Sequence, residues 1–118
     1  MARDVLVVDD EEDVRDFLES LLEDHGFSVR LAKDGLQAME LIQEKLPDLV
    51  LLDLMMPQET GTGLYRRMRE RKELKEIPVI VISGLAGRHV AVSKSVPVFD
   101  KPIDQDGLLT AIETLTAT

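Results

Sequence analysis

Two short apolar runs in this chain end in carboxylates. Residues 5–8, Val-Leu-Val-Val, lead directly into Asp9 and Asp10. Residues 49–52, Leu-Val-Leu-Leu, lead into Asp53. Runs that are apolar at every position predict strands buried on both faces, as in a parallel sheet covered by helices. Because parallel strands end at one edge, where open α/β sheets place their sites, we expect the three carboxylates to lie together there.

The remaining chain alternates between strand-like and helix-like segments. Runs rich in Val, Ile and Leu predict strands at residues 4–8, 27–31, 48–52, 77–82 and 96–99, with Pro97 placing the last strand at an edge. Segments of helical period between them predict one α/β domain over residues 1–118, with a parallel sheet between helices. Since only 3% of the residues are aromatic, the core must be aliphatic.

Four helices have sequence signals of their own. The first has an apolar face of Val14, Phe17, Leu18, Leu21 and Leu22 and is expected to end at Gly26 in a left-handed conformation. The second starts with a capping-box-like Asp34-Gly35-Leu36-Gln37 and is expected to bury Ala38, Leu41, Ile42 and Leu46. Two more are expected at residues 62–74 and 104–115, the last burying Leu108, Ala111, Ile112 and Leu115.

The composition excludes several kinds of function. A formal net charge of -9 repels phosphate backbones, so we expect no direct nucleic-acid binding by this domain. The absence of cysteine excludes disulfides, thiolate nucleophiles and zinc-thiolate sites. The first residues lack the long apolar segment of a signal peptide or membrane span, so the expected location is cytoplasmic, without membrane contact.

Clustered carboxylates repel one another, and a hard divalent cation with oxygen ligands is the expected remedy. Mg²⁺ fits, with Asp10 and Asp53 as direct ligands and Asp9 acting through water. Asp53 could then attack a phosphorus atom in line and become an aspartyl phosphate. Ser83 lies just beyond the predicted fourth strand and Lys101 just beyond the fifth. There they would bind phosphoryl oxygens as charge develops.

The ordered set of motifs resembles the receiver domain of two-component response regulators across essentially the whole chain. The set consists of Val8-Asp9-Asp10, Asp53-Leu54-Met55-Met56-Pro57 with Gly61, Ser83-Gly84, and Lys101-Pro102. The resemblance implies a flavodoxin-like (βα)5 three-layer sandwich with strand order 2-1-3-4-5. It further implies the backbone carbonyl of Met55 as a metal ligand and a cis Lys101-Pro102 bond.

The same resemblance implies a function in a two-component system or phosphorelay. Asp53 would accept a phosphoryl group from the phosphohistidine of a histidine kinase or histidine phosphotransfer protein, and the change would alter binding to an unknown downstream effector. The domain would catalyse only its own phosphorylation and dephosphorylation, and so would not be an enzyme in the usual sense. We expect a monomer or a weak dimer.

Two departures from the family pattern modify these expectations. Eighteen positions separate Ser83 from Lys101, fewer than in most receivers, which predicts a short, frayed or absent fourth helix, as in a subset often attached to hybrid kinases. Val98 stands where most receivers carry an aromatic residue, and alternation sends Phe99 to the opposite face of the strand. We expect Ser83 to bias residues 84–94 between two states instead.

The phosphoryl lifetime depends, by the same resemblance, on the side chains at Met55 and Leu85. Neither can orient an attacking water, which predicts slow self-dephosphorylation.

Two other functions remain open at this point: a pseudo-receiver that only docks partners, and a small Mg²⁺-dependent aspartyl-phosphate phosphohydrolase. The second is disfavoured because such enzymes carry an Asp-x-Asp pattern, whereas Asp9 and Asp10 are adjacent.

Overall fold

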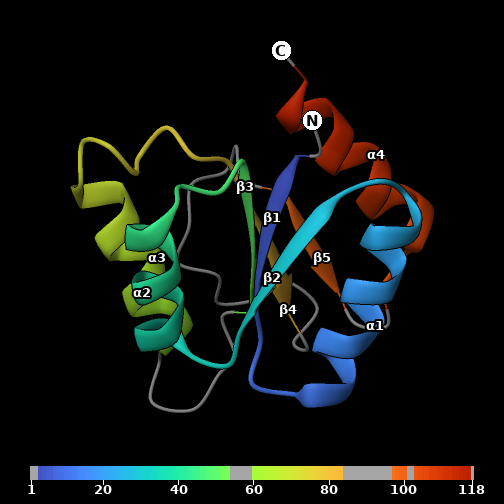
Figure 1. Ribbon diagram of the computed structural model, residues 1–118, viewed down its shortest axis with the longest axis horizontal. Helices are drawn as coiled ribbons and strands as arrows, with labels where there is room; N and C mark the ends of the chain where they lie inside the picture. Colours follow the sequence, from blue (N-terminus) through green and yellow to red (C-terminus); the bar gives the residue numbers. More distant parts are fainter. Residues whose placement is uncertain (1–2, 54–59, 84–96, 101–102, 118) are drawn as a thin grey trace.

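A computed structural model describes residues 3–53, 60–83, 97–100 and 103–117 of the chain. Five strands form one sheet in the order β2-β1-β3-β4-β5, and each pairs with its neighbour in parallel (Figure 1). The strands are β1 (Asp4–Val8), β2 (Ser28–Ala32), β3 (Leu49–Asp53), β4 (Val79–Ser83) and β5 (Val98–Asp100). The predicted flavodoxin-like strand order, with the fifth strand at an edge, is therefore confirmed.

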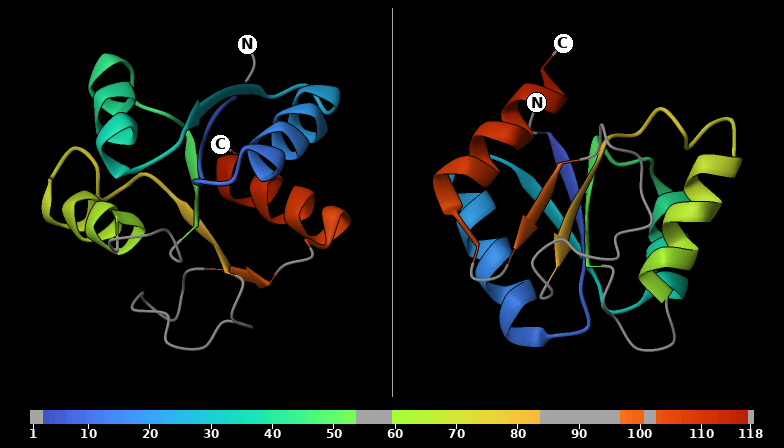
Figure 2. Two further views of the ribbon diagram at one scale, coloured as in Figure 1. Left: turned by 90° about the horizontal axis from the view of Figure 1, so that it is seen from below. Right: turned by 180° about the vertical axis from the view of Figure 1, so that it is seen from behind.

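Helices cover both faces of this sheet. They are α1 (Glu12–Asp24), α2 (Gly35–Glu44), α3 (Thr60–Glu70) and α4 (Gln105–Thr116). Helices α2 and α3 pack on one face, and α1 and α4 pack on the other, which gives the predicted three-layer sandwich (Figure 2). The expected fourth helix of the (βα)5 pattern falls between β4 and β5, and residues 84–96 lie outside the described part of the chain.

Strand alternation divides the core into two halves. In β1, Leu6 and Val8 face α2 and α3, whereas Val5 and Val7 face α1 and α4. All four are buried, as expected for a strand in the middle of a parallel sheet. Both halves are built mainly from aliphatic side chains, in agreement with the low aromatic content.

The helix ends follow the sequence signals closely. Gly26 adopts a φ of 87° just beyond α1, a conformation that glycine tolerates best. Asp34 caps α2, its side chain accepting the N–H of Gln37 at 2.8 Å. The side chain of Gln37 accepts the N–H of Lys33 at 2.8 Å, not that of Asp34 itself. The reciprocal half of the capping box is therefore displaced by one residue.

Three apolar residues expected in the core are instead exposed. Phe17 is 40% exposed, whereas Leu18 and Leu22 of the same helix are fully buried. Leu46 is 51% exposed because α2 ends at Glu44 and Lys45 is extended, so helical spacing no longer places it. Leu115 lies outward in the last turn of α4, where Thr116 is buried and donates its hydroxyl to the carbonyl of Ile112 at 2.7 Å.

Several predicted boundaries also shift. The third helix begins at Thr60 and ends at Glu70, earlier than residues 62–74, while β2 and β3 each end one residue later than expected. The shift in β3 places Asp53 inside the sheet.

Across the described ranges, none of the helices combines the length and apolarity needed to cross a membrane.

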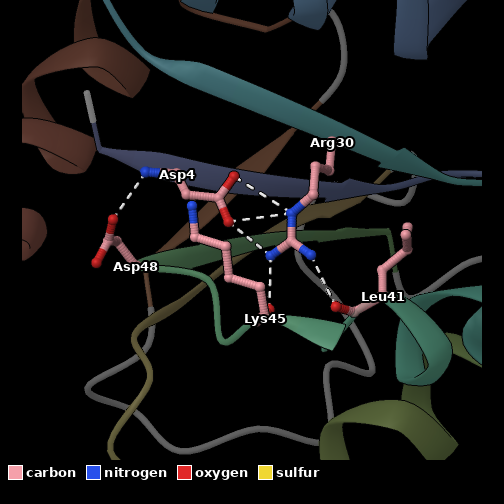
Figure 3. Close-up of polar contacts among 5 residues, drawn as sticks. All are labelled: Asp4, Arg30, Leu41, Lys45 and Asp48. Atoms are coloured by element: carbon pink, nitrogen blue, oxygen red, sulfur yellow. Dashed lines mark hydrogen bonds and ion pairs between the residues drawn. The ribbon is translucent and has the colours of Figure 1, made fainter. Parts of the chain in front are cut away.

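A polar network joins three elements at the amino end of the sheet (Figure 3). Arg30 of β2 contacts the carboxylate of Asp4 at the start of β1, with Nη2 2.6 Å from Oδ2. The same guanidinium donates to the carbonyls of Leu41 at 2.7 Å and Lys45 at 2.8 Å, at the end of α2. Asp48 accepts the N–H of Asp4 at 2.7 Å. This end of the sheet is thus held by one ion pair and by hydrogen bonds to backbone groups.

Candidate metal centre

Four carboxylates meet at the opposite, carboxyl end of the sheet. Asp9, Asp10, Glu11 and Asp53 each offer an oxygen, and these oxygens all lie within 4.8 Å of one another. The pairing of Val8 with Leu52 explains the meeting, because the next residues of the two strands, Asp9 and Asp53, are then at the same level. The structure therefore brings together the three carboxylates that the sequence placed at this edge.

The members of this carboxylate cluster differ in accessibility. Asp9 and Asp53 are buried, whereas Asp10 and Glu11 are exposed. Asp53 ends the central strand β3 and is held between β1 and β4, being paired with Ile82 of β4. The cluster therefore joins two buried carboxylates, which follow or end neighbouring strands, to two exposed ones.

Local hydrogen bonds shape the turn between β1 and α1. The N–H of Asp9 donates to the carbonyl of Ala32 at 3.1 Å, which continues the pairing of β1 with β2. One carboxylate oxygen of Asp9 accepts the N–H of Glu11 at 2.9 Å, an Asx turn. The Nη1 atom of Arg15 donates to the backbone carbonyl of Asp9 at 2.7 Å.

Glu11 was not among the site residues expected from the sequence. It precedes α1 as its N-cap residue, and its side chain makes no capping hydrogen bond to the helix. Its carboxylate is instead part of the cluster. The available signal was its position as the third acid of the run Asp9-Asp10-Glu11, immediately after a buried strand.

The other predicted site residues are described less completely. Ser83 ends β4, where its backbone pairs with Asp100 of β5, so it lies at the same edge of the sheet as the cluster. Met55, Leu85, Lys101, the Lys101-Pro102 bond and the loop of residues 84–94 lie outside the described residues. Their roles stay predictions.

The alternation predicted for β5 is confirmed. Val98, at the position of the usual aromatic residue, is exposed. Phe99 packs against the half of the core that faces α1 and α4. The aromatic ring of Phe99 thus lies on the face of the sheet that α1 and α4 cover. On the opposite face, β5 presents only the small aliphatic side chain of Val98.

The donor set fits a hard divalent cation. All four groups supply carboxylate oxygens, the ligands that Mg²⁺ prefers, and no sulfur or imidazole belongs to the cluster. Four such groups within 4.8 Å repel one another, and a cation among them relieves the repulsion. The exposed members leave room for the waters that Mg²⁺ retains.

Comparison with known proteins agrees with this arrangement. The chain matches the response regulator receiver domain over residues 5–113. It is similar to Protein Rrf1 of Nitratidesulfovibrio vulgaris, with 33% identity over 114 residues, which cover 97% of this chain and 83% of that protein.

Solved structures show the same likeness. The receiver domain of NtrX from Brucella abortus is 33% identical, with a TM-score of 0.85 and coverage of 97% of this chain and 98% of that one. The receiver domain of a signal transduction histidine kinase from Syntrophus aciditrophicus has a TM-score of 0.87 at 24% identity, covering 98% and 91% of the two chains, and supports the fold alone. The chain therefore belongs to the response regulator receiver domains of two-component signalling.

Proposed function

We propose that Asp53 accepts a phosphoryl group from the phosphohistidine of a histidine kinase or histidine phosphotransfer protein, and that this change alters binding to a downstream effector. The observation that carries the proposal is the position of Asp53, buried at the end of the central strand with Asp9, Asp10 and Glu11 around it. Family membership supports the class of donor.

In this reaction the protein supplies one nucleophile and otherwise positions groups and stabilises charge. A carboxylate oxygen of Asp53 forms a bond to phosphorus as the phosphorus–nitrogen bond of phosphohistidine breaks, and the donor imidazole keeps the electron pair. Asp53 can act as a well-placed nucleophile because β3 is paired on both sides and the carboxylate cannot drift far from the sheet edge. Ser83 and Lys101 are proposed to bind the transferred oxygens.

The cation proposed for the site is Mg²⁺. Asp10 and Asp53 would hold it directly, Asp9 through water, and the backbone carbonyl of Met55 would complete the protein ligands. When bound, it supplies positive charge that offsets the charge on the phosphoryl oxygens. Glu11 adds a further carboxylate at the exposed rim of the same cluster.

The output of such a domain is a change in binding, with no turnover of a metabolite. The net charge of -9 favours a protein partner over nucleic acid for this domain. A cytoplasmic location and a monomeric or weakly dimeric state form part of the same proposal.

The deciding experiment is intact mass measurement after incubation with acetyl phosphate and Mg²⁺. We expect one phosphoryl adduct on the wild type, dependent on Mg²⁺ and absent from Asp53→Asn. Asp16→Asn is the matched control, because Asp16 is an exposed carboxylate on α1 outside the cluster, and it should accept the adduct normally.

Other outcomes point to other functions. No adduct with acetyl phosphate, combined with no binding of beryllofluoride, would contradict the proposal and indicate a pseudo-receiver that signals by docking alone. Release of phosphate from small phosphomonoesters over many turnovers would indicate a phosphohydrolase.

A further inference from the structure

A cation at the end of the first turn of α1 contacts the segment that carries most of the carboxylate cluster. Arg15 is half-buried, whereas its neighbours Asp13 and Asp16 are exposed. Its Nη1 atom donates to the backbone carbonyl of Asp9 at 2.7 Å. A hydrogen bond from a charged donor is shorter and stronger than one between neutral groups. Arg15 therefore reaches back over the helix start to hold the end of β1.

That carbonyl controls how the chain leaves the strand. The peptide unit between Asp9 and Asp10 is planar, so fixing its oxygen also fixes the direction of its N–H and of the following Cα atom. The preceding peptide unit is held through the bond from the N–H of Asp9 to Ala32. The following unit is held through the bond from the N–H of Glu11 to the side chain of Asp9.

Three successive peptide units are thus fixed in three different ways. The first depends on strand pairing and the third on a turn within the segment itself. The middle unit, from which Asp10 projects, depends on the side chain of Arg15. The backbone N–H of Arg15 donates to the carbonyl of Glu11 at 3.1 Å, the ordinary first hydrogen bond of the helix, so only the side-chain contact is particular to arginine.

The charge of Arg15 also helps to keep the acids of this segment together before a cation binds. Asp9, Asp10 and Glu11 repel one another and Asp53, and repulsion favours conformations that separate them. A guanidinium bonded to the backbone of this segment opposes that tendency.

We propose that Arg15 is a positioning residue of the cation site, an inference that rests on the proposed function. It holds Asp9, Asp10 and Glu11 in the orientation that faces Asp53 before any cation arrives. A bound cation then has less chain to order, and preorganisation of this kind raises affinity. Arg15 itself is not a ligand, because a guanidinium carries donors only and has no atom that can bind a cation.

The test compares Mg²⁺ affinity, measured by calorimetric or NMR titration, among three variants. Arg15→Met removes the donor and the charge but keeps an apolar stem, and Arg15→Lys restores one donor and the charge. Arg67→Met, on the exposed surface of α3, removes the same charge elsewhere. We expect Arg15→Met to weaken Mg²⁺ binding about tenfold, as loss of an outer partner does in other metal sites. Arg15→Lys should recover most of the loss, and Arg67→Met should bind normally.

A second readout separates positioning from general loss of structure. In metal-free protein, Arg15→Met should shift or broaden the amide signals of Asp10 and Glu11 while leaving those of β3 and β4 unchanged. If Arg15→Met does not fold, Arg15→Gln replaces it, with the same expected direction. Wild-type affinity in the neutral variant would overturn the inference and leave the proposed function intact. A wild type that binds no Mg²⁺ would overturn both.

Discussion

Arg30 and Asp4 form a two-pronged ion pair across β2 and β1. Nη2 and Nε of Arg30 lie 2.6 Å and 3.0 Å from the same oxygen of Asp4, and Nε lies 3.3 Å from the other oxygen. Asp4 is only 3% exposed, so its carboxylate depends on this partner in place of water. The two residues are 26 positions apart, and the pair therefore links separate parts of the chain.

We expect Arg30→Met to destabilise the fold by about 3 kcal/mol, because it leaves the buried carboxylate of Asp4 without its counter-charge. The carbonyl of Lys45 also loses this donor, and that of Leu41 keeps only the N–H of Lys45. Urea unfolding of the variant against wild type measures the loss. Arg67→Met is the matched control and should change stability by less than about 0.5 kcal/mol. A similar small change in Arg30→Met would contradict the prediction.

The two capped helices should differ in their dependence on the cap. Asp34 accepts the N–H of Gln37 at 2.8 Å, whereas Asp104 accepts the N–H of Gly107 at 3.3 Å. Asp34→Ala should therefore cost about 1 kcal/mol, and Asp104→Ala a smaller amount. Thermal or chemical unfolding of both variants makes the comparison. The reverse order would show that the hydrogen-bond length does not govern the effect.

The apolar face of α1 offers a direct test of the packing. Leu18 is fully buried, and Leu18→Ala should cost about 3 kcal/mol through lost contacts and a residual cavity. Phe17→Ala removes a larger side chain from a more exposed position and should cost about 1 kcal/mol or less. Unfolding free energies of the pair measure the difference. Equal losses would mean that Phe17 packs more deeply than its 40% exposure implies.

Mg²⁺ should stabilise the wild type. A ligand that binds only the folded state at about 100 times its Kd adds about 2.7 kcal/mol. This gain should vanish in Asp10→Asn and Asp53→Asn and persist in Asp16→Asn, a change outside the cluster. Melting curves with and without Mg²⁺ give the answer. An equal gain in all four proteins would place the cation elsewhere.

The lifetime of the phosphoryl group should depend on Met55. A methionine side chain cannot hydrogen-bond strongly to an attacking water, whereas an asparagine amide can orient one. Met55→Asn should therefore shorten the lifetime of phosphorylated Asp53. Decay of the phosphoryl adduct, followed by intact mass, measures the rate. A decay rate equal to that of the wild type would contradict this account.

Strand periodicity carried most of the information on fold and site. The fully apolar runs located β1 and β3, and parallel pairing then placed Asp9, Asp10 and Asp53 at one edge. Residues whose environment depends on distant partners could not be found in the same way. Nothing local distinguishes Arg30 from the other arginines, because its partners Asp4 and Lys45 are brought to it only by the completed sheet and α2.

The predictions that Leu46 and Phe17 are buried were wrong for local reasons. Leu46 fitted a helical period, but the helix ended two residues earlier, and a period has no meaning beyond the end of its element. Phe17 fitted the apolar face of α1, but the sheet buries only the middle of that face, at Leu18 and Leu22. Glu11 carries no local signal of its own for the cluster, because an acid before a helix is also favourable to the helix dipole.

Strand β1 carries a buried aspartate at its beginning, Asp4, and another immediately after its end, Asp9. At the first, an arginine balances the charge permanently, and at the second, acids accumulate. One end of the strand is therefore electrostatically balanced, and the other is the end whose electrostatic energy would change on the cation binding and phosphorylation proposed above. Substitutions that adapt the second end to a new partner can accumulate without loosening the first, since a whole strand separates the two.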